Sequence, residues 1–417
     1  MESRCECVKR IVIVGGGASG IAAALSAAKT NPRAEITILE GLDRVGKKIL
    51  ATGNGHCNLG NESMDAACYH TERKDRVKAW IEGMPTEMTV DFFREHGLLC
   101  AADEAGRLYP YAHQASMVLD ILLLALKRNH IQAVCDCKVN SISYKNGMFT
   151  VRAENGATYC ADAVILATGG KAAPKQGVTG IGYELAASFG HRKTGLYPCL
   201  VPMKCEHHAL RGLKGIRVEC KTTLYADGSF VAAEKGELQL TDYGISGIPA
   251  LQLSCYLGQL KGRYTEASID FFSEQTEEEL LMLLKRRVEA YTEETLETLF
   301  LGLIHKRILY ALMKDVHLEP LSRTADTLRE KDLKRLAAVL KDWCLPVAGS
   351  LSWEHAQVTG GGISLGEITD RFESNHQKGL YLTGELLDVA GMCGGYNLHW
   401  AWCSGIIAGK AAAEETV

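Results

Sequence analysis

The first forty residues place apolar and helix-forming segments in an order that predicts one βαβ unit. Residues 11–14 (IVIV) are all apolar, which is typical of a parallel strand buried on both faces. The turn GGGASG follows at 15–20, and residues 21–29 are rich in alanine and favour a helix. An Asn-Pro pair ends this helix, and residues 35–40 (EITILE) have the pattern of a second strand.

The next hundred residues combine a long glycine-rich loop with short regular elements. Residues 46–61 contain four glycines and no amphipathic period, so we expect a loop whose backbone lies close to a ligand. Apolar positions at helical spacing predict helices near 86–95 and 114–128. Between 133 and 159 the pattern alternates and two Asn-Gly pairs interrupt it, which predicts an antiparallel meander. Residues 163–166 then read as a buried strand that ends in Ala-Thr-Gly-Gly.

The pattern changes between residues 196 and 345, which we interpret as an inserted domain. Residues 196–274 are β-rich, whereas residues 275–345 are charged, rich in leucine and helical in period. Glycine-rich segments then resume, and an alanine-rich helix is expected from about 398 to 414. We therefore predict an α/β fold: a discontinuous Rossmann-type domain made of residues 1–195 and 346–417, with a β-barrel-like and helical domain inserted into it.

The turn after the first strand carries a dinucleotide-binding fingerprint. Gly15 permits the tight turn, Gly17 lets the backbone approach a pyrophosphate, and Gly20 lets the helix pack on the strand. The helix start at Ala18 and Ser19 offers unpaired N–H groups to phosphates. Glu40 lies at the end of the second strand, where its carboxylate would accept hydrogen bonds from ribose hydroxyls. The alternative is a glycine turn without a ligand, which this strand–turn–helix context disfavours.

Composition and charge exclude several classes of protein. The chain has 417 residues, of which 47% are hydrophobic and 23% charged, as in an ordinary globular protein of two or three domains. The net charge is −4 and no basic stripe is present, so we expect no nucleic-acid partner. The apolar runs are too short for a membrane span and no signal peptide is evident, so we expect a cytoplasmic protein.

Cysteine and histidine spacing indicates neither a disulfide framework nor a metal site. The fifteen cysteines are odd in number and scattered, which favours reduced thiols, and the Cys5/Cys7 and Cys135/Cys137 pairs lack partners at zinc-finger spacing. We interpret His207-His208 as a surface pair and predict no metal. Protease, P-loop and α/β-hydrolase motifs are absent from the sequence.

The order of the later segments resembles that of flavoproteins of the two-dinucleotide type, which favours FAD over NAD as the resident cofactor. The segments at 46–61, 359–368 (TGGGISLGEI) and 382–409 (LTGELLDVAGMCGGYNLHWAWCSGIIAG) make the match closer. They resemble the family that groups BaiN-type bile-acid-pathway reductases with aminoacetone-oxidase-type proteins. The resemblance covers the first 195 and about the last 70 residues, and reaches the insert mainly through residues 236–251 (GELQLTDYGISGIPAL).

The resemblance implies which residues hold FAD. In this chain they would be Gly15, Gly17, Ala18, Ser19, Gly20, Glu40, Lys48, Gly53, Gly55, Cys57, Asn58, Val139, Thr168, Gly169, Gly384, Glu385, Gly395, Asn397 and Leu398. Val139 would contact the adenine, and Glu385 the ribityl chain. A helix that begins near Asn397 would also direct its N–H groups at the negative charge of a reduced flavin. Cys57 has no second cysteine at dithiol spacing, so loop packing is the role we expect for it.

Substrate-facing candidates come from the same segments. They are His56, Tyr109, Tyr396 and Trp400, and His399 is more often a satisfied histidine than an acid. Tyr396 and Trp400 have an equal alternative as core aromatics that stabilise the last helix. Relatives usually carry Gly and Arg where this chain has Asn54 and His56, so its substrate is expected to differ. We assign no catalytic acid.

The resulting hypothesis is an FAD-dependent oxidoreductase that reduces an activated C=C bond in a conjugated carbonyl compound, with a steroid-like molecule as one substrate class. A second G-x-G-x-x-G motif is absent from the sequence, so NAD(P)H is expected to dock transiently. Three alternatives remain: an oxidase that passes electrons from a small amine to O2, an RNA-associated flavoprotein, and a flavin-binding redox sensor without turnover. The oligomeric state is open.

Overall fold

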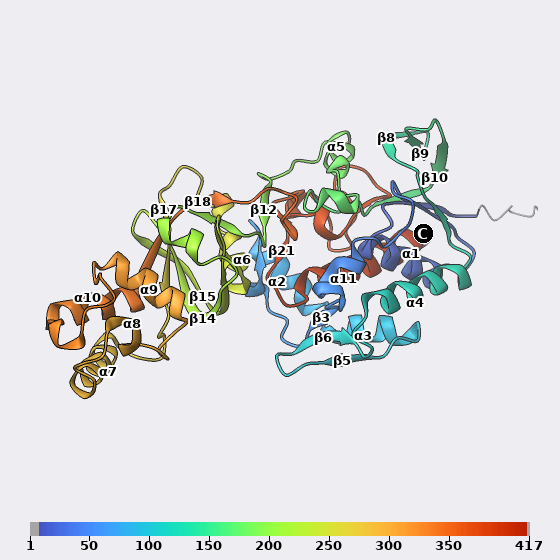
Figure 1. Cartoon of the computed structure of the whole chain (residues 1–417). Coiled ribbons are helices and arrows are strands. Elements are labelled where there is room, and N and C mark those ends of the chain that lie inside the picture. The colour runs from blue at the N-terminus through green and yellow to red at the C-terminus, as the bar shows by residue number, and fades with distance from the viewer. Residues whose placement is uncertain (1–7, 415–417) are drawn as a thin grey trace, which may run out of the picture. The chain divides into compact units, whose positions relative to one another are not determined.

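The computed structural model describes residues 8–414, and the chain divides into two compact units. Unit 1 contains the chain up to Tyr197 and from Gln357 onwards, and unit 2 is Pro198–Ala356. Each unit has an apolar core of its own. Figure 1 shows the helices and strands of the whole chain. Strand β18 (Trp343–Ser350) belongs to unit 2. The Cys5/Cys7 pair lies outside the described residues.

Unit 1 is built on a five-stranded parallel sheet in the order β20-β11-β1-β2-β7. The strands are β1 (Arg10–Val14), β2 (Glu35–Leu39), β7 (Gln132–Val134), β11 (Ala163–Leu166) and β20 (Leu380–Leu382). Helix α1 (Ala18–Thr30) connects β1 to β2, which confirms the predicted βαβ unit. The centre of this sheet pairs β1 with β11, which is more than a hundred residues later in the chain.

The other helices of unit 1 and its small sheets surround this core. The helices are α2 (Lys74–Glu82), α3 (Thr86–Glu95), α4 (Ala115–Arg128), α5 (Ile181–Ala187) and α11 (Tyr396–Ala413). The predicted meander is β8 (Val139–Lys145), β9 (Met148–Ala153) and β10 (Thr158–Ala161). The remaining strands are β3 (Gly60–Asn61), β4 (Tyr69–His70), β5 (Cys100–Ala102), β6 (Arg107–Pro110), β19 (Val358–Gly360) and β21 (Ala390–Gly391), and β12 (Tyr197–Cys199) contains the boundary.

Helices α1 and α11 lie side by side, so the two ends of the chain build the same part of unit 1 (Figure 1). Small residues allow the contact. A Cβ atom at Gly405 would overlap the backbone of Ser19, and one at Gly409 would overlap the backbone of Ala23. A larger side chain at either glycine would therefore force the two helices apart. No helix among residues 8–414 is long and apolar enough to cross a lipid bilayer.

Unit 2 is a closed six-stranded barrel with a helical extension, as the sequence predicts. The barrel order is β13-β16-β15-β14-β17-β18. Its strands besides β18 are β13 (Met203–Cys205), β14 (Arg217–Ala226), β15 (Ser229–Leu240), β16 (Gly244–Gly247) and β17 (Thr265–Asp270). The helices are α6 (Ile248–Ser254), α7 (Glu277–Ala290), α8 (Leu296–Leu299), α9 (Lys306–Asp315) and α10 (Glu330–Lys341).

One pair of cysteines in unit 2 corrects the expectation of reduced thiols. Cys199 and Cys255 form a disulfide, with their Cα atoms 4.6 Å apart. The partners are 56 residues apart in the sequence, and Cys255 lies directly after α6. Sequence spacing cannot reveal this pair, because the end of β12 and the end of α6 come together only in the folded chain. Cysteines that remain free include Cys57, Cys137 and Cys403, all of them buried.

Candidate cofactor-binding site

The turn between β1 and α1 has the close backbone approaches that its glycines predict. Gly15 has a φ of +105°, and a Cβ atom there would lie 2.5 Å from the carbonyl oxygen of Ala167. A Cβ atom at Gly20 would overlap the carbonyl oxygen of Gly15. At Gly17 an added Cβ atom would meet nothing within 4 Å. Gly15 and Gly20 are therefore required by packing, whereas Gly17 borders open space where a ligand can approach the backbone.

The first turn of α1 leaves its N–H groups available. Gly17 is the N-cap, no side chain caps the helix, and its first turn contains no acidic residue. The N–H groups of Ala18 and Ser19 therefore have no partner within the helix, and the positive end of the helix dipole is not neutralised. This arrangement suits a phosphate group.

Glu40 directly follows β2 and lies beside the glycine turn. Its Oε2 atom accepts a hydrogen bond from the Gly16 N–H at 2.8 Å, and its Oε1 atom accepts one from the Leu42 N–H at 2.9 Å. The Glu40 carbonyl accepts a bond from the Cys137 N–H at 2.8 Å, which brings the start of β8 and its buried Val139 close to Glu40. The carboxylate is thereby fixed beside the glycine turn, as a ribose-binding role requires.

A second group joins residues more than three hundred positions apart. Lys48 Nζ lies 2.7 Å from Glu385 Oε2. The other oxygen of Glu385 accepts hydrogen bonds from the Thr359 N–H at 3.0 Å and from the Thr359 hydroxyl at 2.9 Å. A Cβ atom at Gly170 would lie 2.9 Å from Glu385 Oε1, so the Ala-Thr-Gly-Gly turn contacts this network. The structure thus brings together Lys48, Glu385 and the turn that contains Thr168 and Gly169.

Two buried residues beside this network were missed by the sequence analysis. The hydroxyl of Tyr183 is buried and has no hydrogen-bond partner among the described residues. Burial raises the pKa of this phenol, and the charges of Glu385 and Asp388 raise it further. Burial also raises the pKa of Asp388 to about 6, although its carboxylate accepts a hydrogen bond from the Glu72 N–H at 3.1 Å. Neither residue lies in a recognisable motif; a tyrosine in a short helix carries no sequence signal.

The long loop folds back onto the start of α11. Residues Ile49–Gly55 form a kinked 3₁₀ segment in which Gly53 and Asn54 have positive φ values. The Asn58 amide donates to the carbonyls of Gly60 and Leu108 and accepts a hydrogen bond from the Gly395 N–H at 3.1 Å. An added Cβ atom at Gly55 would meet nothing within 4 Å, so this glycine also borders open space. Hydrogen bonds therefore fix the loop at Asn58, whereas its backbone is accessible to a ligand at Gly55.

Cys57 lies inside the loop, where the sequence analysis expects a packing role for it. Its side chain is fully buried, and burial raises the pKa of the thiol to about 12. At neutral pH the sulfur is therefore a protonated thiol, which is a poor nucleophile. Its backbone N–H donates to the carbonyl of Thr52 at 3.0 Å, which closes the turn.

Helix α11 begins as α1 does. Gly395 is its N-cap in a left-handed conformation, with no capping side chain and no acid in the first turn. The Asn397 side chain instead bonds backward: its Oδ1 accepts from the Gly391 N–H at 2.8 Å and its Nδ2 donates to the Gly391 carbonyl at 2.7 Å. Leu398 is half-buried in the same turn. The N–H groups of this turn stay available for a negatively charged ligand atom.

The substrate-facing candidates separate into a pair that reaches the surface, the exposed His56 and the half-buried Tyr109, and a buried pair. His56 is exposed, and its Nδ1 atom lies 2.7 Å from the carbonyl oxygen of His113. The ring of Tyr109 also lies near His113, and the centroids of these two rings are 5.4 Å apart. His56 and Tyr109 thus share a surface with His113, which the sequence analysis did not name. A Cβ atom at Gly53 would lie 3.7 Å from Tyr109, so this surface adjoins the loop.

Trp400 and Tyr396 are core residues instead. Trp400 is 2% exposed, packs against Trp80 and Phe372, and donates its indole N–H to the carbonyl of Gly384 at 3.1 Å. Tyr396 packs edge-to-face on Tyr69. The reason is the position of their helix: α11 runs through the core of unit 1, so its aromatic side chains turn inward. These contacts match the alternative of core aromatics rather than a substrate surface.

His399 is a satisfied core histidine. It is fully buried, and its Nε2 lies 2.9 Å from the Met84 carbonyl while its Nδ1 lies 2.9 Å from the Thr89 hydroxyl. Burial lowers the pKa of its imidazole, so the ring is neutral at pH 7. Nε2 then carries the proton, because only a donor satisfies the carbonyl, and Nδ1 accepts from the hydroxyl.

The whole chain matches a known protein family. The family model described as HI0933-like protein Rossmann domain matches residues 9–411. A 3-dehydro-bile acid delta(4,6)-reductase of Clostridium scindens is 38% identical over 410 residues, which span 98% of this chain and 100% of that protein. This chain belongs to the HI0933-like family. It is an FAD-dependent oxidoreductase of the Rossmann type, as its dinucleotide fingerprint predicts.

Other matches extend the comparison. A ribosomal RNA dihydrouridine synthase of Escherichia coli is 26% identical over 395 residues, which span 94% of this chain and 95% of that protein. Among solved structures, a 3-ketosteroid-delta4-(5alpha)-dehydrogenase of Rhodococcus jostii superposes with a TM-score of 0.52 at 14% identity, covering 99% of both chains. At that identity the match shows a shared fold.

The residues present fit FAD. Two helix starts lack caps and acidic residues, Gly17 and Gly55 border open space, and the buried Tyr183 hydroxyl has no partner among residues 8–414. Each of these features leaves a polar group or a free volume for a ligand that carries phosphates and hydroxyls. The open backbone of the glycine turn suits the diphosphate, and Glu40 suits a ribose.

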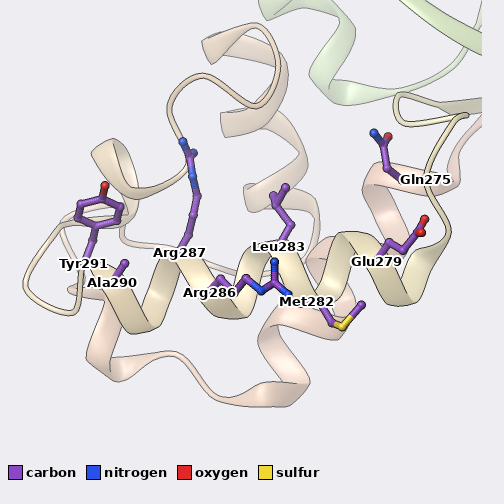
Figure 2. Close-up of a pocket in the computed structure, with 8 residues that line it drawn as sticks. All are labelled: Gln275, Glu279, Met282, Leu283, Arg286, Arg287, Ala290 and Tyr291. Carbon is purple, nitrogen blue, oxygen red and sulfur yellow. The ribbon is translucent and has the colours of Figure 1, made fainter.

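A hollow on helix α7 of unit 2 is lined by residues 275–291, none of which belongs to the candidate cofactor-binding site. It has a volume of about 490 Å³ and is lined along one helix face by Met282, Leu283, Arg286 and Tyr291, among others (Figure 2). None of the predicted cofactor or substrate residues lines it. Volume alone therefore does not identify the functional site of this protein.

Proposed function

We propose that the protein reduces a C=C bond conjugated with a carbonyl group in a bile-acid-like or other steroid-like ketone, with NADH or NADPH as electron donor. The observation that carries the proposal is the 38% identity, over the full length of both chains, to a protein named as a 3-dehydro-bile acid delta(4,6)-reductase. Identity of this extent includes both units, so a shared reaction class is the simplest explanation of it.

FAD, when bound, supplies hydride transfer between a donor and a carbon atom of the substrate. The N–H groups at the start of α1 would hold its diphosphate, and the Glu40 carboxylate would hold a ribose. Lys48 and Glu385 fix each other through a 2.7 Å ion pair, which positions the loop against the late turn of the chain. The start of α11 directs free N–H groups at any negative charge that develops near it.

The electron donor is assigned as a transient one. The sequence contains a single G-x-G-x-x-G fingerprint, and it follows β1. That fingerprint is committed to FAD in this proposal, so NAD(P)H would bind only for the duration of the transfer. The positions of His56 and Tyr109 beside the loop make their exposed surface the first place to look for substrate contacts.

A second candidate follows from the second relative. A dihydrouridine differs from uridine by saturation of one ring C=C bond, and that bond is conjugated with a carbonyl group. The E. coli ribosomal RNA dihydrouridine synthase therefore shares a bond class with the bile-acid reductase, although its substrate is a large RNA. Reduction of a uracil ring in RNA is the alternative for this chain.

One anaerobic experiment distinguishes the candidates. The holoenzyme is reduced with NADH or NADPH and then mixed separately with a 4-en-3-one steroid, a 4,6-dien-3-one steroid, the matching saturated 3-ketone and a uridine-containing RNA. We expect the conjugated steroids to restore the oxidised flavin spectrum and to gain two hydrogen atoms by mass spectrometry, whereas the saturated ketone does neither. Re-oxidation by RNA alone would replace the proposal with the second candidate. Peroxide release with a small amine in air would indicate the oxidase instead.

A further inference from the structure

Two groups of side chains among residues 8–414 bring two histidines and a carboxylate within 4.8 Å of one another. In unit 1 the group is His191, His376 and Glu367. In unit 2 it is His207, His208 and Asp315. Both sets combine donor atoms that zinc prefers, so their hydrogen-bond partners decide which of them is able to take a metal ion.

The unit 1 group is already neutralised. Glu367 Oε2 accepts a hydrogen bond from the Arg192 N–H at 2.7 Å, and its Oε1 accepts one from the Arg192 guanidinium at 2.8 Å. A cation would have to displace this guanidinium. His191 is also committed, because its Nε2 lies 2.7 Å from the hydroxyl of Ser374. His191 Nδ1 is buried without a hydrogen-bond partner among residues 8–414, but the carboxylate that would bind a cation here is already paired with Arg192.

The unit 2 group has an unsatisfied carboxylate. Asp315 is the last residue of α9, and its Oδ1 atom is buried without a hydrogen-bond partner in the described part of the chain. Its Oδ2 atom accepts a hydrogen bond from the Trp343 indole N–H at 3.0 Å, which fixes the carboxylate plane. Asp315 forms no ion pair with a lysine or arginine within residues 8–414. A half-buried carboxylate that faces two imidazole rings and no lysine or arginine is a place where a cation is favourable.

The distances between each histidine and the Asp315 carboxylate are close to those between zinc ligands, and the three ligand atoms lie within 4.8 Å of one another. His208 Nε2 lies 3.1 Å from Asp315 Oδ1, and His207 Nε2 lies 3.4 Å from Asp315 Oδ2. Ligands at about 2.0–2.1 Å from a tetrahedral Zn²⁺ are about 3.3–3.4 Å apart, so small side-chain adjustments suffice. The three residues line a hollow of about 420 Å³, which leaves room for a water molecule as fourth ligand.

We propose that His207, His208 and Asp315 form a zinc site in unit 2. The site joins the 3₁₀ turn at His208–Gly212 to the end of α9, and the Trp343 indole orients the ligating carboxylate from behind. Zinc is preferred over magnesium or calcium, because two of the three donors are imidazole nitrogens. The role of the ion is to hold this turn against the helix.

Metal binding requires one rearrangement, which is small. The Nδ1 atom of His207 accepts a hydrogen bond from the Ala209 N–H at 3.3 Å. A neutral imidazole that ligates through Nε2 carries its proton on Nδ1, so this long hydrogen bond is lost when zinc binds. Without metal, the same two rings would simply donate their Nε2–H groups to Asp315. The competing explanation is therefore a hydrogen-bonded His–Asp cluster that binds no ion.

The test uses untagged holoenzyme, dialysed against a chelator and titrated with ZnCl₂ by calorimetry, with metal content measured after gel filtration. We expect one zinc per chain at micromolar affinity or tighter and an increase in Tm. Asp315→Asn keeps an acceptor for Trp343 but removes the charge, and His208→Ala removes a largely exposed ligand. Each should lower zinc affinity by at least about 100-fold.

A matched control and a spectroscopic readout exclude other sites. His376→Ala removes a histidine from the unit 1 cluster and should bind zinc like the wild type. Substitution with Co²⁺ should give the visible bands of a tetrahedral site in difference spectra, without the near-ultraviolet charge-transfer band of a thiolate ligand. The proposal is overturned if the wild type takes up no zinc, if Asp315→Asn and His208→Ala bind it unchanged, if His376→Ala abolishes binding, or if the thiolate band appears.

Discussion

Helix α7 of unit 2 begins in the opposite way to helices α1 and α11 of unit 1. In unit 2, α7 has a complete capping box: the Thr276 hydroxyl accepts from the Glu279 N–H at 3.2 Å, and the Glu279 carboxylate accepts from the Thr276 N–H at 2.9 Å. Its first turn contains three glutamates, whose negative charges interact favourably with the positive N-terminal end of the helix dipole. In unit 1, α1 and α11 start at Gly17 and Gly395 with no capping side chain and no acid.

The capped start of α7 contributes to stability, whereas the uncapped starts of α1 and α11 are available for cofactor binding. The helix α7 satisfies its own terminal N–H groups and gains stability, whereas α1 and α11 leave theirs for a ligand. Substitutions at the two kinds of start should therefore affect cofactor binding and stability separately.

The largest effect, on FAD affinity, is expected when an N-cap side chain is introduced at the uncapped start of α1. Gly17→Asp introduces a good N-cap and a negative charge where we expect the diphosphate. Gly17 has an ordinary φ of −83° and open space around it, so the variant should fold, with equal or higher Tm in the flavin-free form. FAD affinity should fall by at least about 100-fold, because one misplaced charge pair of about 2.7 kcal/mol has that effect. Fluorescence titration with FAD measures it.

Gly17→Ala is the matched control. It adds a Cβ atom but neither a cap nor a charge, so its FAD affinity should lie between that of the wild type and that of Gly17→Asp. Equal FAD binding by Gly17→Asp and the wild type would contradict the assignment of this turn to the diphosphate.

The second prediction concerns the pH dependence of the stability of unit 1, to which the buried Asp388 contributes. Its pKa is about 6 in the folded chain and about 3.8 when exposed, so between pH 4 and 6 the folded state keeps a proton that the unfolded state has released. Stability should therefore fall as pH rises through this window, by about 3 kcal/mol from this group. Asp388→Asn should remove this contribution, as urea unfolding of unit 1 at pH 4, 5, 6 and 7 would show. An unchanged pH dependence in the variant would contradict it.

The third prediction concerns the ion pair between the loop and the late turn. Lys48→Met leaves the Glu385 carboxylate half-buried with only Thr359 as partner, which should lower the free energy of unfolding by about 1–2 kcal/mol and reduce the FAD content. Lys47→Met is the control, since the adjacent lysine forms no ion pair with a residue of the described range 8–414. Similar losses in both variants would indicate a general charge effect.

The smallest effect is expected at the capped helix. Thr276→Ala removes the α7 cap and should lower the stability of unit 2 by about 1 kcal/mol, with FAD affinity unchanged. Chemical unfolding and flavin titration on the same sample measure both quantities. A change in FAD affinity would show that the two units do not divide these roles as proposed.

The sequence predicted the parts of the site that are local. The fingerprint from Gly15 to Gly20 and the strands beside it follow from contiguous residues, because one turn and its flanking periodicity contain the whole signal. The meander and the helix at 86–95 were predicted for the same reason, since Asn-Gly turns and helical spacing are short-range.

Contacts between distant residues were not accessible to such patterns. The Lys48–Glu385 ion pair spans 337 positions, and the partners in the Cys199–Cys255 disulfide are 56 positions apart. His207-His208 read as a surface pair until the fold placed Asp315 beside it. Trp400 had two equal interpretations, and only the path of α11 through the core decides between them. In each case the decisive neighbour comes from a segment whose position depends on the complete fold.

The packing of α11 on α1 also constrains how the protein is made. The grooves that accept Gly405 and Gly409 belong to a helix near the start of the chain, and β20 completes the sheet from residues 380–382. On a ribosome, β1 and α1 emerge hundreds of residues before these partners, so the nascent chain must keep them unpaired until residues 380–413 have been made. A chain truncated before α11 would lack both the packing partner of α1 and the second uncapped helix start, so we expect it not to bind FAD.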